Sequence, residues 1–131
     1  MKIFRLGITG LLLCMSGWLT AQSVVKTPQG ARLETPDGMC QGEVIFYSPS
    51  IVRVVKYPLA QQEAVEHQSL SVVMSPQKVK FGYKEQGDEI VLRTSAMHVL
   101  VNKADGTIRF QDKDGRLLLA EQGSPSFKQY E

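Results

Sequence analysis

Apolar and polar residues alternate with a period of two along much of the chain, and this pattern restricts the fold more than any other feature of the sequence. Val79, Phe81 and Tyr83 alternate with lysine and glycine, and Ile108 and Phe110 alternate with threonine, arginine and glutamine. Successive side chains of a β-strand point to opposite faces, so each run predicts a strand with one buried and one solvated face.

Other runs are apolar on both faces and predict strands in the middle of a sheet that is covered on both sides. These runs are 44–47, 51–57 and 90–92. Further strands are predicted at 70–74, 97–102 and 117–120 because β-branched and apolar residues dominate there. The best helical candidate is 59–67, which is short and mostly polar, so a loop with one helical turn is predicted instead.

Turn residues separate the predicted strands. The segments 48–50 and 75–77 carry proline, which cannot donate to a β-ladder, and 85–88 predicts a short hairpin loop. Asp105-Gly106 and Asp114-Gly115 are strong turn dipeptides that leave room for one strand between them, at 107–111. The sequence therefore predicts an all-β fold, an antiparallel meander of about eight or nine strands arranged as a β-sandwich.

The N-terminus predicts a secretory signal peptide over residues 1–21. Lys2 and Arg5 precede the apolar run 6–15, and small and polar residues follow it. Cleavage after Ala21 is favoured, and cleavage after Ser23 remains the alternative. The apolar run is shorter than the roughly 20 residues that a membrane-spanning helix needs. We therefore expect an exported protein, periplasmic or extracellular, whose residues 22–131 form one domain without a membrane span.

Charge and composition exclude several classes of partner. Without Lys2 and Arg5, 13 basic residues balance 13 acidic ones. A balanced surface gives no electrostatic reason to bind nucleic acid or an anionic membrane. The sequence has no phosphate-binding loop, zinc cluster or nucleophile elbow, so no cofactor is predicted.

No residue can be assigned to catalysis, cofactor binding or metal binding from the sequence. Cys40 is the only cysteine after the leader, which excludes an intramolecular disulfide within the mature part. A Cys–His dyad with His67 or His98 is not excluded by spacing, but a structural thiol is the favoured interpretation.

Segment 112–115 looks like part of a calcium loop. However, Arg116 and Gly123 stand where an acid or amide and a bidentate glutamate are needed, so a tight hairpin is favoured. Lys78, Lys80 and Lys84 form a basic stripe, which is typical of a solvated strand face. The acids are predicted to be structural: Asp88, Asp105, Asp112 and Asp114 at turns, Glu43, Glu89 and Glu121 at strand ends, and Glu63 and Glu66 in a polar connection.

The order of segments resembles the N-terminal domain of family-31 glycoside hydrolases, the α-glucosidase and α-xylosidase family. Segment 42–58 contains the phrase Ile51-Val52-Arg53-Val54, segment 94–101 supplies Thr94 followed by Met97, Val99 and Val101, and segment 106–121 runs from Gly106 through Asp112 and Gly115 to Glu121. Together these phrases cover essentially all of 42–121, and the ordered set is more specific than any one of them.

The resemblance implies a β-sandwich of the galactose-mutarotase type, here represented in part. It also implies that the reaction occurs elsewhere, in a following (β/α)₈ barrel of about 250 residues that acts in cis on carbohydrate. The family's nucleophile lies in a W-x-D-M phrase of that barrel, and this sequence has no such phrase, so no catalytic residue is carried over. The alternative is a free-standing exported carbohydrate-binding or adhesion module, which would need exposed aromatic side chains to stack on sugars.

Overall fold

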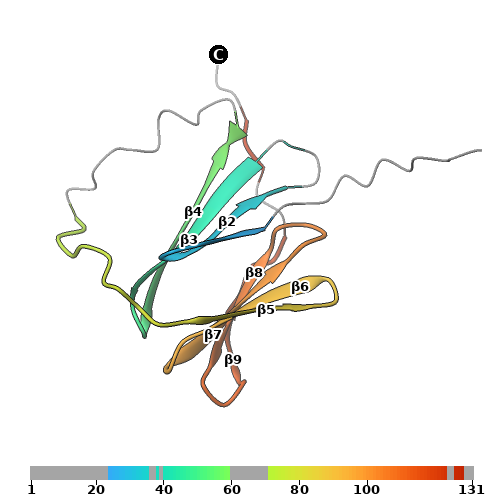
Figure 1. The fold of residues 1–131 in the computed structure, drawn as a ribbon. Helices are drawn as coiled ribbons and strands as arrows, with labels where there is room; N and C mark the ends of the chain where they lie inside the picture. The colour runs from blue at the N-terminus through green and yellow to red at the C-terminus, as the bar shows by residue number, and fades with distance from the viewer. Residues whose placement is uncertain (1–23, 36–37, 39, 60–70, 124–125, 129–131) are drawn as a thin grey trace, which may run out of the picture.

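Two antiparallel sheets make up the fold. The computed structural model describes residues 24–35, 38, 40–59, 71–123 and 126–128. Sheet A has the strand order β1 (Val25–Thr27), β2 (Gly30–Glu34), β3 (Cys40–Ser48), β4 (Ile51–Pro58). Sheet B has the order β5 (Gly82–Gln86), β6 (Glu89–Arg93), β7 (Met97–Asn102), β8 (Ile108–Asp112), β9 (Leu117–Ala120). Figure 1 shows the two sheets as separate layers. The prediction of an all-β antiparallel sandwich is confirmed.

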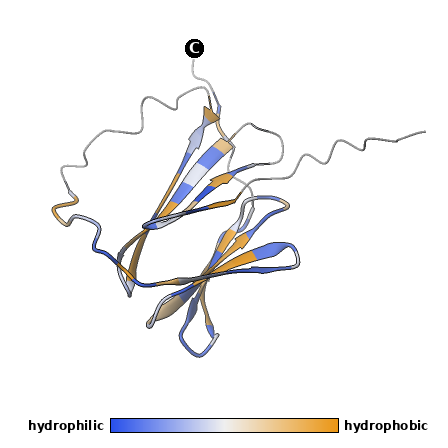
Figure 2. Ribbon diagram, viewed as in Figure 1, coloured by the Kyte–Doolittle hydropathy of each residue, from blue (hydrophilic) through white to orange (hydrophobic). Residues whose placement is uncertain are grey.

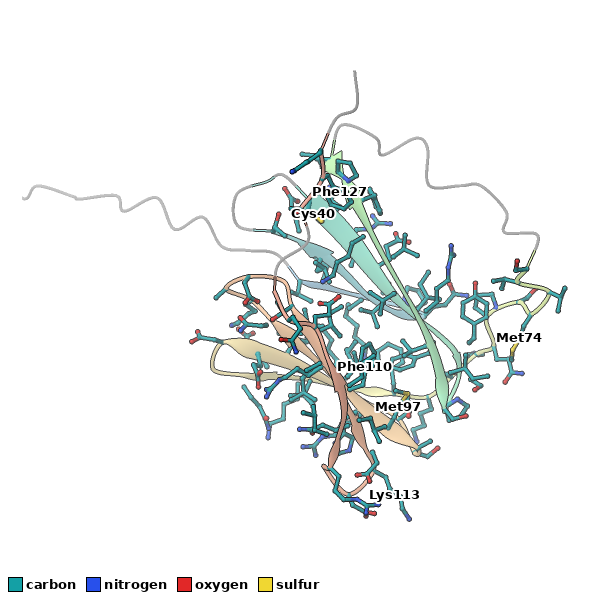
Figure 3. All side chains as sticks on the ribbon, turned by 180° about the vertical axis from the view of Figure 1, so that it is seen from behind. Cys40, Met74, Met97, Phe110, Lys113 and Phe127 are labelled. Atoms are coloured by element: carbon teal, nitrogen blue, oxygen red, sulfur yellow. The ribbon has the colours of Figure 1, made fainter. Side chains whose placement is uncertain are left out.

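The core lies between the two sheets and uses one face of each. Alternate residues of β3 are buried, ending in Phe46, whose ring centroid is 5.3 Å from that of Phe81. Figure 2 shows hydrophobic residues along the strands and hydrophilic residues at the hairpin ends. Figure 3 places Met97 and Phe110 between the sheets. The buried cluster consists of Ala31, Leu33, Val44, Phe46, Val79, Ile90, Leu92, Met97, Val99, Val101 and Ile108.

The turns that the sequence predicts connect strands of sheet B. Gly87 and Asp88 form a two-residue hairpin loop, with Gly87 at φ 58°, between the paired residues Gln86 and Glu89. Gly106 and Gly115 also have positive φ, 71° and 85°, at the two Asp-Gly dipeptides. Glycine meets the steric demand of such positions without the Cβ penalty of other residues. The tight hairpin predicted at 112–115 is confirmed.

The structure corrects two strand predictions and adds two strands that were not predicted. Residues 71–74 of the predicted strand 70–74 are not a strand: they belong to the connection between the sheets and pair with no strand of the described part of the chain. The run at 79–83 enters a ladder only at Gly82, although Val79 and Phe81 still turn toward the core. Strands β1 and β2 were not predicted, and the sequence signal for them is the alternation of Ala31 and Leu33 after a Pro-Gln-Gly turn.

Strand β4 also differs from the prediction in its position. Its sequence is apolar on both faces and predicts a central strand, whereas within the described residues it is the edge of sheet A. Strand β3 is central, as predicted, and so is β6. The predicted helical turn at 59–67 lies almost entirely outside the described residues.

Gly30 is a position where only glycine fits. A Cβ built there would lie 2.0 Å from the Val44 carbonyl oxygen, and φ is 156°. We expect Gly30→Ala to lower the free energy of unfolding by about 1–3 kcal/mol, because either the clash or a strained backbone must be accommodated. Urea unfolding followed by circular dichroism measures the change.

Gly82→Ala is the matched control for this prediction. A Cβ at Gly82 meets nothing closer than 3.9 Å. Alanine there should be neutral or stabilising by up to about 1 kcal/mol, since it costs less backbone entropy than glycine. Equal losses of stability in both variants would show that the contact at Val44 is not the cause.

Candidate functional site

The thiol and the histidines do not form a dyad in the described structure. Cys40 is buried at the start of β3 on the inward-facing side of sheet A, and its Sγ donates to the Gln41 carbonyl at 3.3 Å. His98 lies on the outward face of β7, opposite Arg93 and Gln111. Sheet B therefore stands between Cys40 and the His98 side chain. His67 lies outside the described residues.

Cys40 instead lies at a turn that is held by hydrogen bonds to Thr35. The Thr35 hydroxyl accepts from the Cys40 amide at 3.0 Å, and the Thr35 amide donates to the Cys40 carbonyl at 2.9 Å. These bonds join the end of β2 to the start of β3. A structural role of the thiol, as the sequence indicates, is consistent with this geometry.

The carboxylates of the strands are engaged with cations. Glu43 binds Arg32 at 3.0 Å, Glu89 binds Arg109, and Glu85 binds Lys103. Glu89 begins β6, as predicted for a strand end, but Glu43 lies well inside β3, so that prediction is wrong. The register explains the difference: β3 begins at Cys40, earlier than the apolar run indicates, and Glu43 faces Arg32 directly across the β2–β3 ladder.

Glu121 makes the most buried of these ion pairs. Its Oε2 lies 2.5 Å from Lys56 Nζ and accepts from the Ile108 amide at 2.7 Å. Lys56 Nζ also donates to the Gly106 carbonyl at 2.9 Å. The side chain of Lys56 is 9% exposed and that of Glu121 32%. This cluster links β4 of sheet A to the strand ends of sheet B and is a connection within the fold.

Asp105 and Asp112 accept hydrogen bonds from the backbone and side chains of the turns that they begin. Asp105 Oδ1 accepts from the Thr107 hydroxyl at 2.7 Å and from the Thr107 amide at 2.9 Å, and these hydrogen bonds lower the pKa of Asp105. Asp112 accepts from the Arg116 amide and guanidinium, which lower the pKa of Asp112. The described residues contain no group of three or more His, Cys, Asp or Glu side chains placed to hold a metal ion.

These two aspartates predict a loss of stability in acid. A carboxyl whose folded-state pKa is lowered stabilises the fold above its ordinary pKa of 3.8, and this contribution disappears as the pH falls below that value through the folded-state pKa. Urea unfolding between pH 7 and pH 2 should show the decline. The double variant Asp105→Asn/Asp112→Asn keeps the acceptor oxygens but cannot titrate, so its decline should be smaller. An unchanged pH dependence in this variant would contradict the assignment.

Aromatic side chains are mostly withdrawn from the surface. Tyr47 and Tyr57 are buried, and burial is the main cause that raises the pKa of Tyr57. Burial likewise raises the pKa of Tyr83, whose hydroxyl donates to the Val24 carbonyl at 3.0 Å. Among the aromatic residues that the structure describes, only Phe127 belongs to the exposed large hydrophobic side chains. Sugar stacking therefore has little support on the described surface.

Strand β9 carries the most prominent exposed apolar group. Leu117, Leu118 and Leu119 are 60%, 62% and 63% exposed, and β9 is the edge of sheet B within the described residues. The lysines of the predicted basic stripe, Lys78, Lys80 and Lys84, are also exposed. They are charged, so their exposure is expected for a solvated face. No helix among the described residues is long and apolar enough to cross a membrane.

Comparison with known proteins adds one similarity. No family model matches the chain. Alpha-glucosidase 2 of Bacillus thermoamyloliquefaciens is 32% identical over 79 residues, which are 60% of this chain and 10% of that protein. The similarity indicates a relation to glycoside hydrolases, and the matched segment spans about a tenth of the relative's length.

Proposed function

We propose that residues 22–131 are an N-terminal β-sandwich segment of an exported α-glycoside hydrolase of the family-31 type, and that this segment carries no catalytic residue. The observation that carries the proposal is the similarity to an alpha-glucosidase in a chain whose described part is a β-sandwich. The ordered phrases over 42–121 support the N-terminal position in the parent enzyme. Carbohydrate is the substrate of the parent enzyme, and a barrel in cis supplies the chemistry.

The engaged carboxylates support the absence of catalysis in this segment. Retaining glycoside hydrolysis needs two carboxyl groups about 5–5.5 Å apart across a sugar site. Glu43, Glu89 and Glu121 each face a cation instead. The Glu43 contact joins the neighbouring strands β2 and β3, the Glu89 contact joins β6 to β8 across β7, and the Glu121 contact joins the two sheets, which is a structural use of the carboxylate.

We expect no hydrolysis of aryl α-glucoside or aryl α-xyloside by the purified chain. The matched sample is a chain extended through the barrel that the downstream reading frame encodes, and activity is expected there alone. Release of the aryl group is measured by absorbance. Turnover by the short chain that disappears on changing one of its acids would contradict this prediction.

The reading frame after codon 131 separates the proposal from the binding-module alternative. An open frame that leads to a W-x-D-M phrase supports the proposal that the parent protein is a glycosidase. A stop codon with no such phrase, together with sugar binding by the chain, supports a free-standing module.

Export is tested on the same gene product. Mass spectrometry of the exported protein should show an N-terminus at Gln22, or at Val24 if cleavage follows Ser23. Retention of Met1 in the exported protein would contradict the assignment of residues 1–21 as a signal peptide.

A further inference from the structure

We propose that Asp114, in the turn between β8 and β9, is a site of spontaneous isoaspartate formation, whereas Asp105, in the turn between β7 and β8, is protected from the same reaction by its contacts. Both aspartates are followed by glycine, so the two sites have the same local chemistry in different surroundings. The reaction needs no enzyme and no reagent other than water. This modification goes beyond the proposed function and does not depend on it.

The reaction joins the side chain of an aspartate to the backbone of the next residue. The amide nitrogen of Gly115 loses its proton and forms a bond to Cγ of Asp114, and one carboxyl oxygen leaves as water, which gives a five-membered succinimide. Water then opens the ring. If it breaks the bond between this nitrogen and the original backbone carbonyl carbon, the chain runs on through the side-chain carbonyl, which is isoaspartate; if it breaks the new bond, aspartate is restored. Glycine favours ring closure because it has no side chain to block the approach.

Few contacts hinder ring closure at Asp114. Asp114 and Gly115 are exposed, and apart from its chain neighbours nothing lies within 4 Å of the place where a Cβ at Gly115 would be. The Asp114 carboxylate makes no hydrogen bond or ion pair with any residue that the structure describes. The Gly115 amide donates to the Asp112 carbonyl at 3.1 Å, and this bond must open before the nitrogen can react. Lys113 and Arg116 are exposed as well, so opening of the turn uncovers no core side chain and costs little free energy.

The surroundings of Asp105 oppose the same reaction. Its Oδ1 accepts from the Thr107 hydroxyl at 2.7 Å and from the Thr107 amide at 2.9 Å. Gly106 is buried; its amide donates to the Asn102 carbonyl at 2.9 Å, and its carbonyl accepts from Lys56 Nζ at 2.9 Å. The hydrogen bonds from Thr107 also lower the pKa of Asp105, so its carboxyl stays ionised and its oxygen is a poorer leaving group. Ring closure here would require the turn and its contact with sheet A to open together.

Isoaspartate at position 114 would weaken the attachment of β9 to β8. The turn is held by Asp112, whose Oδ1 accepts from the amides of Asp114 and Arg116, both at 2.9 Å. Isoaspartate adds a methylene to the backbone between these two amides, so the present geometry cannot keep both bonds. The first pair of the ladder beyond the turn is Gln111 with Leu117, and the four residues of β9 are exposed or half-buried. We therefore expect the N-terminal end of β9 to open in aged chains.

The test is incubation of the complete folded chain in buffer at pH 7 and 37 °C for several weeks. Cleavage after arginine places Asp105 in the peptide 94–109 and Asp114 in the peptide 110–116. Chromatography separates the isoaspartate forms, and electron-transfer fragmentation identifies the modified position. We expect isoaspartate to accumulate at least about tenfold faster in 110–116 than in 94–109, which corresponds to about 1.4 kcal/mol in the free energy of reaching the transition state.

A third Asp-Gly dipeptide does not interfere with this measurement. Asp37 lies outside the described residues, and the same cleavage places it in a separate peptide, 33–53. Incubation of the chain in urea provides the unfolded reference. Without the fold, the sites at Asp105 and Asp114 should form isoaspartate at similar rates.

Two substitutions test the two sites separately. Asp114→Glu keeps the charge on an exposed side chain but would have to close a six-membered ring, which is much slower, so the isomerised form of 110–116 should disappear. Thr107→Val removes the hydroxyl bond to Asp105 and keeps the shape of the side chain. Isoaspartate should then form faster in 94–109, while its rate of formation in 110–116 stays unchanged.

Three outcomes would overturn the proposal: no isoaspartate in 110–116 of the folded chain, equal accumulation in both peptides, or an unchanged rate at Asp105 in Thr107→Val. Hydrogen exchange measures the structural consequence, and the amides of β9 should exchange faster in the aged chain than in fresh chain. Unchanged exchange would contradict the expected opening of β9. None of these measurements involves glycosidase activity, so failure of this inference and failure of the proposed function are distinguishable.

Discussion

Replacing Phe46 by alanine will lower the free energy of unfolding by about 3–5 kcal/mol, the range measured for truncation of buried aromatic residues. Phe46 is fully buried, and its ring contacts Phe81, which precedes β5. The substitution therefore removes contacts between sheet A and the segment that leads into sheet B. Since a domain of this size has a total stability of about 5–15 kcal/mol, the variant should be largely destabilised in urea titrations at 25 °C.

Phe127→Ala is the matched control for Phe46→Ala. The chemical change is the same, but Phe127 is 46% exposed. We expect a loss within about 0.5 kcal/mol, as for most surface substitutions. Similar losses in both variants would contradict the assignment of Phe46 to a shared core.

Glu121→Ala is expected to cost about 2–4 kcal/mol. It leaves the buried Lys56 ammonium with the Gly106 carbonyl as its remaining partner among the described contacts, and the Ile108 amide loses its acceptor. Breaking a buried ion pair from one side costs about 3–5 kcal/mol, and the partial exposure of Glu121 reduces this figure. Thermal and urea unfolding both report the loss.

The double variant Lys56→Met/Glu121→Leu tests the cause. It removes both charges and keeps most of the volume, so it should be more stable than Glu121→Ala. Glu85→Ala serves as the exposed control, because the Glu85 side chain is 63% exposed and its pair with Lys103 should be worth about 0–1 kcal/mol. A double variant less stable than Glu121→Ala would show that the charge of Lys56 is not the source of the cost.

The fold was predictable where the local hydropathy pattern and the turn residues agreed. Strand β8 follows from alternation with a period of two and from the Asp-Gly turns on either side of it, and β3, β6 and β7 follow from runs of apolar and β-branched residues. Residues 71–74 show the limit of such prediction, because Val72 and Val73 have strand-forming side chains but pair with no strand among the residues that the structure describes. Strand formation depends on a partner, and a local pattern contains no information about one.

The contact between Lys56 and Glu121, which joins the two sheets, was not predictable from the sequence. Lys56 and Glu121 are 65 residues apart, and although Glu121 ends the phrase 106–121, that phrase gives no indication of its partner. Their contact follows from the stacking of β4 over the end of β9, which is a property of the whole sandwich. The exposure of Leu117 to Leu119 was missed for the same reason, since an apolar run of this kind usually indicates burial.

The strand order within each sheet has a consequence for how the protein folds. Within each sheet every described strand pairs with its neighbours in sequence, so each sheet can form from successive hairpins with short loops to close. The long-range contacts, such as Val24 with Tyr83 at a separation of 59 residues, join one sheet to the other. We therefore expect hairpin formation to be fast and docking of the two sheets to limit the folding rate. Phe46 and Leu92 would then gain protection from solvent only in this last step.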